Sequence, residues 1–149
     1  MKISFLLGFI LLFLTSQSYA DNPSDLDLEV WKSPTCGCCN KWVDHLKKNG
    51  FSVKTYNVGN TAIRSKFGIS KKYGSCHTAF IGGYAIEGHV PAQDIKDLLK
   101  NKPIALGLSV PGMPIGSPGM DGIQYGNQKD SFNVLLLKSD DSYEVFNSY

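Results

Sequence analysis

The chain has 149 residues and a mass of 16.4 kDa, a size typical of one domain. Hydrophobic residues make up 42% and charged residues 19%, so the chain can bury a core and is not a charge-rich disordered tail. The net charge of +2 gives no electrostatic basis for binding nucleic acid or an acidic membrane surface. Four cysteines are too few for a disulfide-dense mini-protein, which favours a chemical use for them.

Residues 1–20 are predicted to be a secretory signal peptide. Lys2 gives the positive start, residues 3–14 form an apolar run, and Ser18 and Ala20 occupy the −3 and −1 positions of the expected cleavage site. The run has 12 residues, fewer than the roughly 20 that span a bilayer, although an uncleaved anchor is the alternative. We expect a mature protein that starts at Asp21, is soluble in the periplasm and has no membrane span.

After a loose lead-in at residues 21–26, the periodicity predicts the element order β-α-β-α-β-β-α over residues 27–101. Two-residue alternation indicates strands, helical spacing of apolar residues indicates helices, and Gly82-Gly83 indicates a tight hairpin turn. This is the order of the thioredoxin and glutaredoxin core. The predicted elements are strands at 28–32, 51–58, 78–81 and 84–87, and helices at 38–49, 61–67 and 91–100.

Residues 102–149 are predicted to extend the same domain, which would then run over 27–149. Residues 107–126 hold six Gly and three Pro, and we expect an ordered but irregular loop without a regular element. Residues 132–138 and 143–146 then predict a terminal β-hairpin.

Three of the four cysteines lie where the first strand passes into the first helix. Cys36 and Cys39 have C-x-x-C spacing, which places two sulfurs at a helix N-terminus, where unpaired N–H groups and the helix dipole stabilise thiolates. Cys38 lies between them, where a third thiol would interfere with clean disulfide exchange. Soft thiolates favour Cu(I) and Zn²⁺, so three clustered thiols suit a metal.

The fourth thiol is expected to join the other three. In thioredoxin-like folds, the residue just before the third strand faces the C-x-x-C motif, and that place is taken here by Cys76, followed by His77 and Thr78. The alternative is that Cys76 is an inert, small hydrophobic residue.

Histidines and methionines are further candidate ligands. His77 and His89 lie in predicted loops near the cysteines, and Met113 and Met120 lie in Pro/Gly segments that can hold a thioether over the thiols. For each of these residues, an ordinary loop or packing role is the alternative. His45 lies about 10 Å along the helix from Cys38, too far to bind the same ion. We expect His45 and Trp42 to support the site from behind its ligands.

Four motifs follow one another along the chain: Cys36-Gly-Cys-Cys39 with Trp42 and His45, Gly74-Ser-Cys-His-Thr78, Glu87-Gly-His-Val-Pro91, and the loop from Val110 to Met120. In this order they resemble the periplasmic CopG copper-resistance proteins, first catalogued as a bacterial family of unknown function. The resemblance spans residues 28–120. It implies a thioredoxin-like fold, copper bound through the cysteines and a role in copper tolerance.

We therefore interpret the chain as an exported copper-binding protein. It would hold Cu(I) through Cys36, Cys38, Cys39 and Cys76, with His and Met at the periphery, and sequester copper, change its oxidation state as a copper oxidoreductase, or pass it to periplasmic carriers or efflux components. The main alternative is a thiol–disulfide oxidoreductase in which Cys36 attacks and Cys39 resolves. A structural zinc domain fits less well, because it needs two separated cysteine pairs.

The crowding of three cysteines into four residues leads to a sharper hypothesis. So short a backbone segment cannot easily arrange its sulfurs tetrahedrally around one ion, whereas thiolates that bridge two Cu(I) ions relax that constraint. We expect a small polynuclear copper–thiolate cluster, with Cu(I)/Cu(II) chemistry, capped by some of His77, His89, Met113 and Met120.

Overall fold

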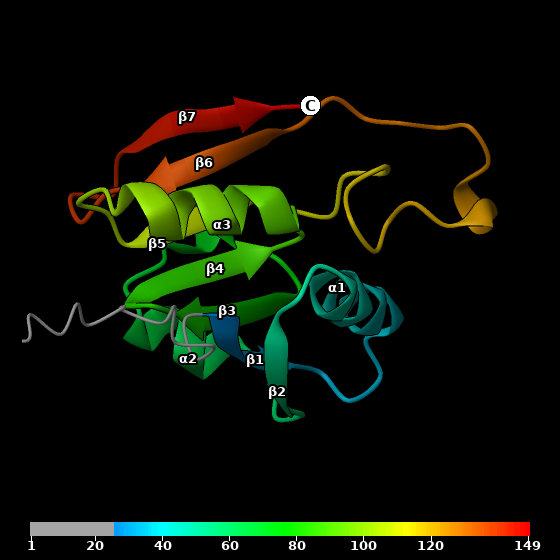
Figure 1. The fold of residues 1–149 in the computed structure, drawn as a ribbon, viewed down its shortest axis with the longest axis horizontal. Coiled ribbons are helices and arrows are strands. Elements are labelled where there is room, and N and C mark those ends of the chain that lie inside the picture. Colours follow the sequence, from blue (N-terminus) through cyan, green and yellow to red (C-terminus); the bar gives the residue numbers. More distant parts are fainter. Residues whose placement is uncertain (1–25) are drawn as a thin grey trace, which may run out of the picture.

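The computed structural model describes residues 26–149, and the predicted signal peptide lies outside them. A seven-stranded mixed sheet forms the centre, in the order β2-β1-β3-β4-β5-β6-β7 (Figure 1). No helix within residues 26–149 is long and apolar enough to cross a membrane. The strands are β1 (Asp27–Lys32), β2 (Ser52–Tyr56), β3 (His77–Ile81), β4 (Tyr84–Gly88), β5 (Gly107–Val110), β6 (Asn133–Leu137) and β7 (Tyr143–Ser148). The helices are α1 (Gly37–Lys48), α2 (Thr61–Lys66) and α3 (Ala92–Asn101), with 3-10 turns η2 (Lys71–Tyr73) and η3 (Ile123–Tyr125).

The first seven predicted elements are confirmed in type and order. Strand β1 pairs in parallel with β2 and antiparallel with β3, and β3 and β4 form the hairpin expected around Gly82-Gly83. Together with α1, α2 and α3 they form a thioredoxin-like α/β core. The predicted C-terminal hairpin is also present, as β6 and β7.

The expectation that residues 107–126 contain no regular element is wrong at both ends of that segment. Residues 107–110 form β5, which pairs in parallel with β4 and antiparallel with β6, and residues 123–125 form η3. Gly107 has φ 151°, and a Cβ atom there would lie 1.7 Å from the Ala85 carbonyl oxygen. This glycine therefore permits two strands to approach closely. Through β5, the hairpin continues the core sheet.

The main hydrophobic core lies between one face of the sheet and two helices. Trp42 and Leu46 of α1 and Ile95 and Leu98 of α3 are fully buried, and they belong to one cluster with the inward-facing residues of β1, β3, β4, β5 and β6. A smaller cluster that includes Ile69 and Tyr73 of η2 covers the opposite face. This packing fixes the N-terminus of α1 beside the start of β3, where the cysteines lie.

Candidate metal centre

The cysteine motif lies at the N-terminus of α1. Cys36 is the N-cap residue, and its Sγ accepts a hydrogen bond from the backbone N–H of Cys39 at 3.3 Å. Cys36 and Cys39 form a disulfide, with their Cα atoms 5.3 Å apart, whereas Cys38 and Cys76 are free thiols. In this structure the site therefore contains two free thiols and one disulfide.

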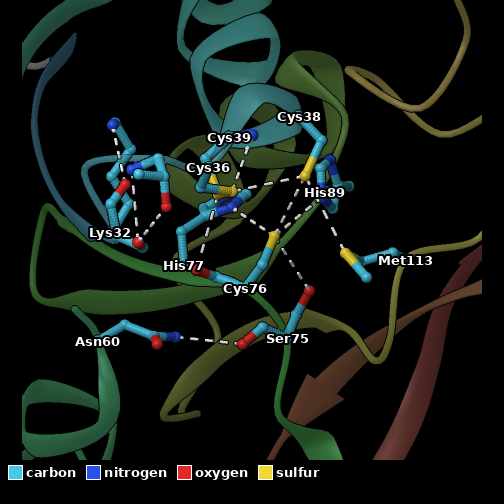
Figure 2. Close-up of a disulfide and its surroundings, with 12 residues drawn as sticks. Lys32, Cys36, Cys38, Cys39, Asn60, Ser75, Cys76, His77, His89 and Met113 are labelled. Carbon is cyan, nitrogen blue, oxygen red and sulfur yellow. Dashed lines mark hydrogen bonds between the residues drawn. A yellow bond between two sulfur atoms is a disulfide. The ribbon is translucent and has the colours of Figure 1, made fainter.

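The four sulfurs lie together, as Figure 2 shows. The Sγ of Cys38 is 3.5 Å from the Sγ of Cys36 and 3.9 Å from the Sγ of Cys76, and all four Sγ atoms lie within 4.8 Å of one another. Cys76 directly precedes β3, and the antiparallel pairing of β3 with β1 carries it to the end of the sheet where α1 begins. The structure therefore places Cys76 where the sequence pattern predicts it.

Cys76 also belongs to a second group, with His77 and His89. The Nε2 atom of His89 is 3.1 Å from the Cys76 Sγ, and the His89 Nδ1 atom is 2.8 Å from the Pro118 carbonyl oxygen. Because a carbonyl can only accept, Nδ1 carries the proton and Nε2 presents a lone pair toward the sulfur. A backbone carbonyl that fixes the tautomer in this way is typical of metal-binding histidines.

His77 is fully buried beside the same sulfur. Its Nδ1 atom is 3.3 Å from the Cys76 Sγ. The centroid of its ring is 4.2 Å from that of the Trp42 ring and 5.0 Å from that of the His89 ring. The Nε2 atom of His77 is buried without a hydrogen-bond partner among residues 26–149. An unpartnered buried nitrogen is costly, and a metal ligand role would account for it.

Burial sets the protonation of these groups. Burial, followed by the nearby Cys38 sulfur, raises the pKa of the Cys76 thiol to about 12. Burial lowers the pKa of His89, and it holds the pKa of His77 well below its usual range, with the charge of His89 acting in the same direction. At neutral pH the two imidazoles are therefore uncharged and available as ligands, whereas Cys76 must lose a proton to bind a metal.

The two loop methionines differ in position. The Sδ atom of Met113 is 4.0 Å from the Cys38 Sγ, and Met113 is half exposed. Cys76 and Met113 both line a surface cavity of about 390 Å³, which opens the Cys76 thiol to solvent. The Sδ atom of Met120 instead accepts a hydrogen bond from the Tyr125 hydroxyl at 3.3 Å, and Met120 is buried. The structure brings Met113, but not Met120, into contact with a cysteine.

The loop before Met120 packs onto the site through Gly119. This residue has φ 89°, and a Cβ atom there would lie 2.7 Å from the Cys38 carbonyl oxygen and 3.3 Å from the His89 Nδ1 atom. Only a residue without a side chain allows the loop to come this close. The loop thereby delivers the Pro118 carbonyl that orients His89.

His45 and Trp42 stabilise segments near the site through hydrogen bonds to backbone atoms. The Trp42 indole N–H donates to the Val90 carbonyl oxygen at 2.8 Å, which fixes the residue next to His89. The His45 Nε2 atom accepts a hydrogen bond from the Ala92 backbone N–H at 3.1 Å, at the start of α3. Partial burial lowers the pKa of His45, so the neutral ring that accepts this bond is favoured.

A buried polar network behind Cys76 was not identified from the sequence. Glu87 is fully buried, and its Oε1 atom accepts from the Ser75 backbone N–H at 2.6 Å and from the Arg64 guanidinium at 3.3 Å. Arg64 and Asn60 both donate to the Ser75 carbonyl oxygen. Burial raises the pKa of Glu87, and its hydrogen bonds and the Arg64 charge oppose that effect. The network fixes the backbone on one side of Cys76.

The fold and site together define a thioredoxin-like protein with a cysteine- and histidine-rich site suited to a soft metal ion. The sequence is 39% identical to two solved structures, described as forms 1 and 2 of the copper resistance protein CopG. Each alignment covers 98% of the solved chain and 84% or 83% of this one, with a TM-score of 0.77. This protein therefore belongs to the CopG family of copper resistance proteins.

A family model described as a protein of unknown function, DUF411, matches residues 73–120. That range includes Cys76, both histidines of the second ligand group and the methionine loop, but not the C-x-C-C motif. No curated protein matches the chain.

Proposed function

We propose that this protein is exported to the periplasm and contributes to copper tolerance by holding Cu(I) at the cysteine-rich site. The two solved relatives carry the description of copper resistance proteins. Thiolate, thioether and imidazole are donors that Cu(I) prefers, and the cysteine sulfurs, thioether and imidazole that can supply them meet around Cys38 and Cys76. Copper ions are the cargo in this proposal, to be sequestered, changed in oxidation state, or passed to periplasmic carriers or efflux components.

One observation carries the proposal of a polynuclear cluster: Cys76 belongs to both ligand groups. A single thiolate that faces Cys38 on one side and His89 on the other is placed to bridge two Cu(I) ions. Reduction of the Cys36–Cys39 disulfide would add two further thiolates within 4.8 Å. We propose His77, His89 and Met113 as capping ligands. Met120 was also predicted to be a ligand, but its Sδ atom contacts Tyr125, and no contact with a cysteine supports that role.

The disulfide favours a second candidate function, thiol–disulfide exchange. Cys36 is partly exposed and caps α1, whereas Cys39 is fully buried, the arrangement expected of an attacking and a resolving thiol. Exchange alone gives no reason for the free thiol of Cys38 between them. Reduced protein that cleaves a model disulfide catalytically, and at the same rate when Cys38 and Cys76 are both replaced by Ser, would favour this candidate.

The copper proposal is tested with reduced protein under anaerobic conditions. Residues 21–149 are loaded with excess Cu(I), dialysed against a competing Cu(I) chelator, and analysed for copper and free thiols. We expect more than one copper per chain, with all four thiols titratable after copper is removed. Cys76→Ser should lose at least half of that copper, because both ligand groups contain this sulfur.

Ser70→Ala is the matched control, since Ser70 lies in the same segment and its side chain makes no capping hydrogen bond. It should retain the full copper content. Copper content unchanged in Cys76→Ser would contradict the placement of Cys76 at the centre of the site, and failure of the native protein to retain Cu(I) would contradict the function itself.

A further inference from the structure

The disulfide borders a set of soft donors that remains complete when Cys36 and Cys39 are joined. We call Cys38, Cys76, His89 and Met113 the retained donors. The Cys38 Sγ lies 3.5 Å from the Cys36 Sγ on one side, and 3.9 Å from Cys76 and 4.0 Å from Met113 on the other. The His89 Nε2 atom completes the set, 3.1 Å from Cys76. In Figure 2, dashed lines join the Cys38 sulfur to Cys36 of the disulfide, to Cys76 and to Met113.

From this arrangement we propose that Cys36 and Cys39 are the electron source for reduction of Cu(II), and that the retained donors keep the Cu(I) that is formed. The inference rests on the proposed copper site and adds a chemical step to it. Two Cu(II) ions each accept one electron. The two thiols lose two protons and form one S–S bond, so one chain converts two Cu(II) to two Cu(I).

The geometry of Cys36 and Cys39 makes them the pair that is oxidised. Their Cα atoms lie 5.3 Å apart, within the range that a disulfide requires, and the structure records the bond between them. The Cys39 backbone N–H points at the Cys36 Sγ and stabilises negative charge there when the pair is reduced. The sulfurs of Cys36, Cys38 and Cys39 lie within 4.8 Å of one another, so a Cu(II) ion held by Cys38 is close to the electron source.

The retained donors suit the product better than the substrate. Two thiol sulfurs, a thioether and a neutral imidazole are soft or borderline donors, which favour Cu(I) over Cu(II). Oxidation of the dithiol removes two ligands but leaves this group in place. In a site where all four thiols were needed to hold any copper, the same oxidation would release the metal.

The test is an anaerobic titration of fully reduced protein with Cu(II) salt. At two equivalents we expect two Cu(I) per chain, measured with a chromogenic Cu(I) chelator in denaturant, and a fall in free thiols from four to two. Alkylation followed by mass spectrometry should find the label on Cys38 and Cys76, and a disulfide between Cys36 and Cys39. Renewal of the dithiol between rounds would require an external thiol reductant.

Two variants separate electron supply from retention. Cys39→Ser should yield less than half of the Cu(I) in the same time. Cys76→Ser should still form the Cys36–Cys39 disulfide, but its Cu(I) should pass to the chelator without denaturant. A disulfide between other cysteines, four remaining thiols, or full and equally fast reduction by Cys39→Ser would overturn the inference.

Direct loading with Cu(I) distinguishes this inference from the proposed function. Protein that binds Cu(I) but leaves Cu(II) unreduced would refute the electron-source role and leave Cu(I) binding intact. Protein that binds no Cu(I) would refute both.

Discussion

Glu87→Gln tests whether the buried carboxylate fixes the segment that carries Cys76. Glu87 is fully buried and accepts hydrogen bonds from the Ser75 backbone N–H, the Arg64 guanidinium and the Thr78 hydroxyl. The glutamine has nearly the same shape and can still accept from Ser75 and Arg64 through its carbonyl oxygen. Its amide nitrogen would face Thr78, whose hydroxyl can rotate to accept.

The substitution therefore removes the charge and keeps most of the contacts. Hydrogen bonds to charged groups contribute about 1.5–3 kcal/mol, and the Arg64 side chain, only 14% exposed, would lose its counterion. We expect the free energy of unfolding in urea at pH 7 to fall by about 2–3 kcal/mol. The affinity for Cu(I), measured by chelator competition, should also fall, because the backbone beside Cys76 becomes less constrained.

Glu144→Gln is the matched control. Glu144 pairs with Lys138 at 3.2 Å, but its side chain is 68% exposed. Surface pairs of this kind contribute about 0–1 kcal/mol, so the control should change little. An unfolding free energy for Glu87→Gln equal to that of the native protein would show that Glu87 is not ionised in the fold, and would refute the argument.

Three further predictions concern the histidines and methionines. His45→Ala should lower the unfolding free energy by about 1 kcal/mol, through loss of its hydrogen bond, with no loss of copper in the dialysis assay. The stability of copper-free protein should fall as the pH drops below 6.5, by up to about 1.4 kcal/mol per pH unit for each of His77 and His89. Their pKa values are lowered in the fold, so the unfolded chain takes up protons first; a flat urea-denaturation profile between pH 7 and 5 would contradict this. Met113→Leu should weaken Cu(I) retention against a chelator, whereas Met120→Leu should alter thermal stability alone; equal copper loss in both variants would contradict the assignment.

The core elements could be predicted because the pattern that identifies each one lies within a short stretch of sequence. Strands show two-residue alternation, and helices show helical spacing of apolar residues. Strand β5 could not be predicted, because only four residues form it and Pro111 follows directly. All four residues are buried. Their pairing with β4 is a long-range contact that a four-residue sequence cannot reveal. The Gly- and Pro-rich composition around Gly107 predicts a loop, whereas this glycine permits the close approach of β5 to Ala85 in β4. A glycine in front of an apolar run can signal either structure.

The site was partly predictable for a similar reason. The element order was enough to place Cys76 near Cys38, since thioredoxin-like topology fixes which segment faces the C-x-x-C motif. The roles of Glu87 and Arg64 depend on burial and on a contact across 23 positions in the sequence, and charged residues usually lie on the surface. The one available signal was that Glu87 lies within a strand that is otherwise apolar or small.

The form in which copper is held is the central claim, and X-ray absorption spectroscopy of reduced protein saturated with Cu(I) tests it most directly. The account predicts more than one copper per chain, mainly sulfur ligation, and a short copper–copper scattering path from thiolates that bridge neighbouring ions. A single copper per chain without a copper–copper path would contradict the cluster and leave a mononuclear carrier.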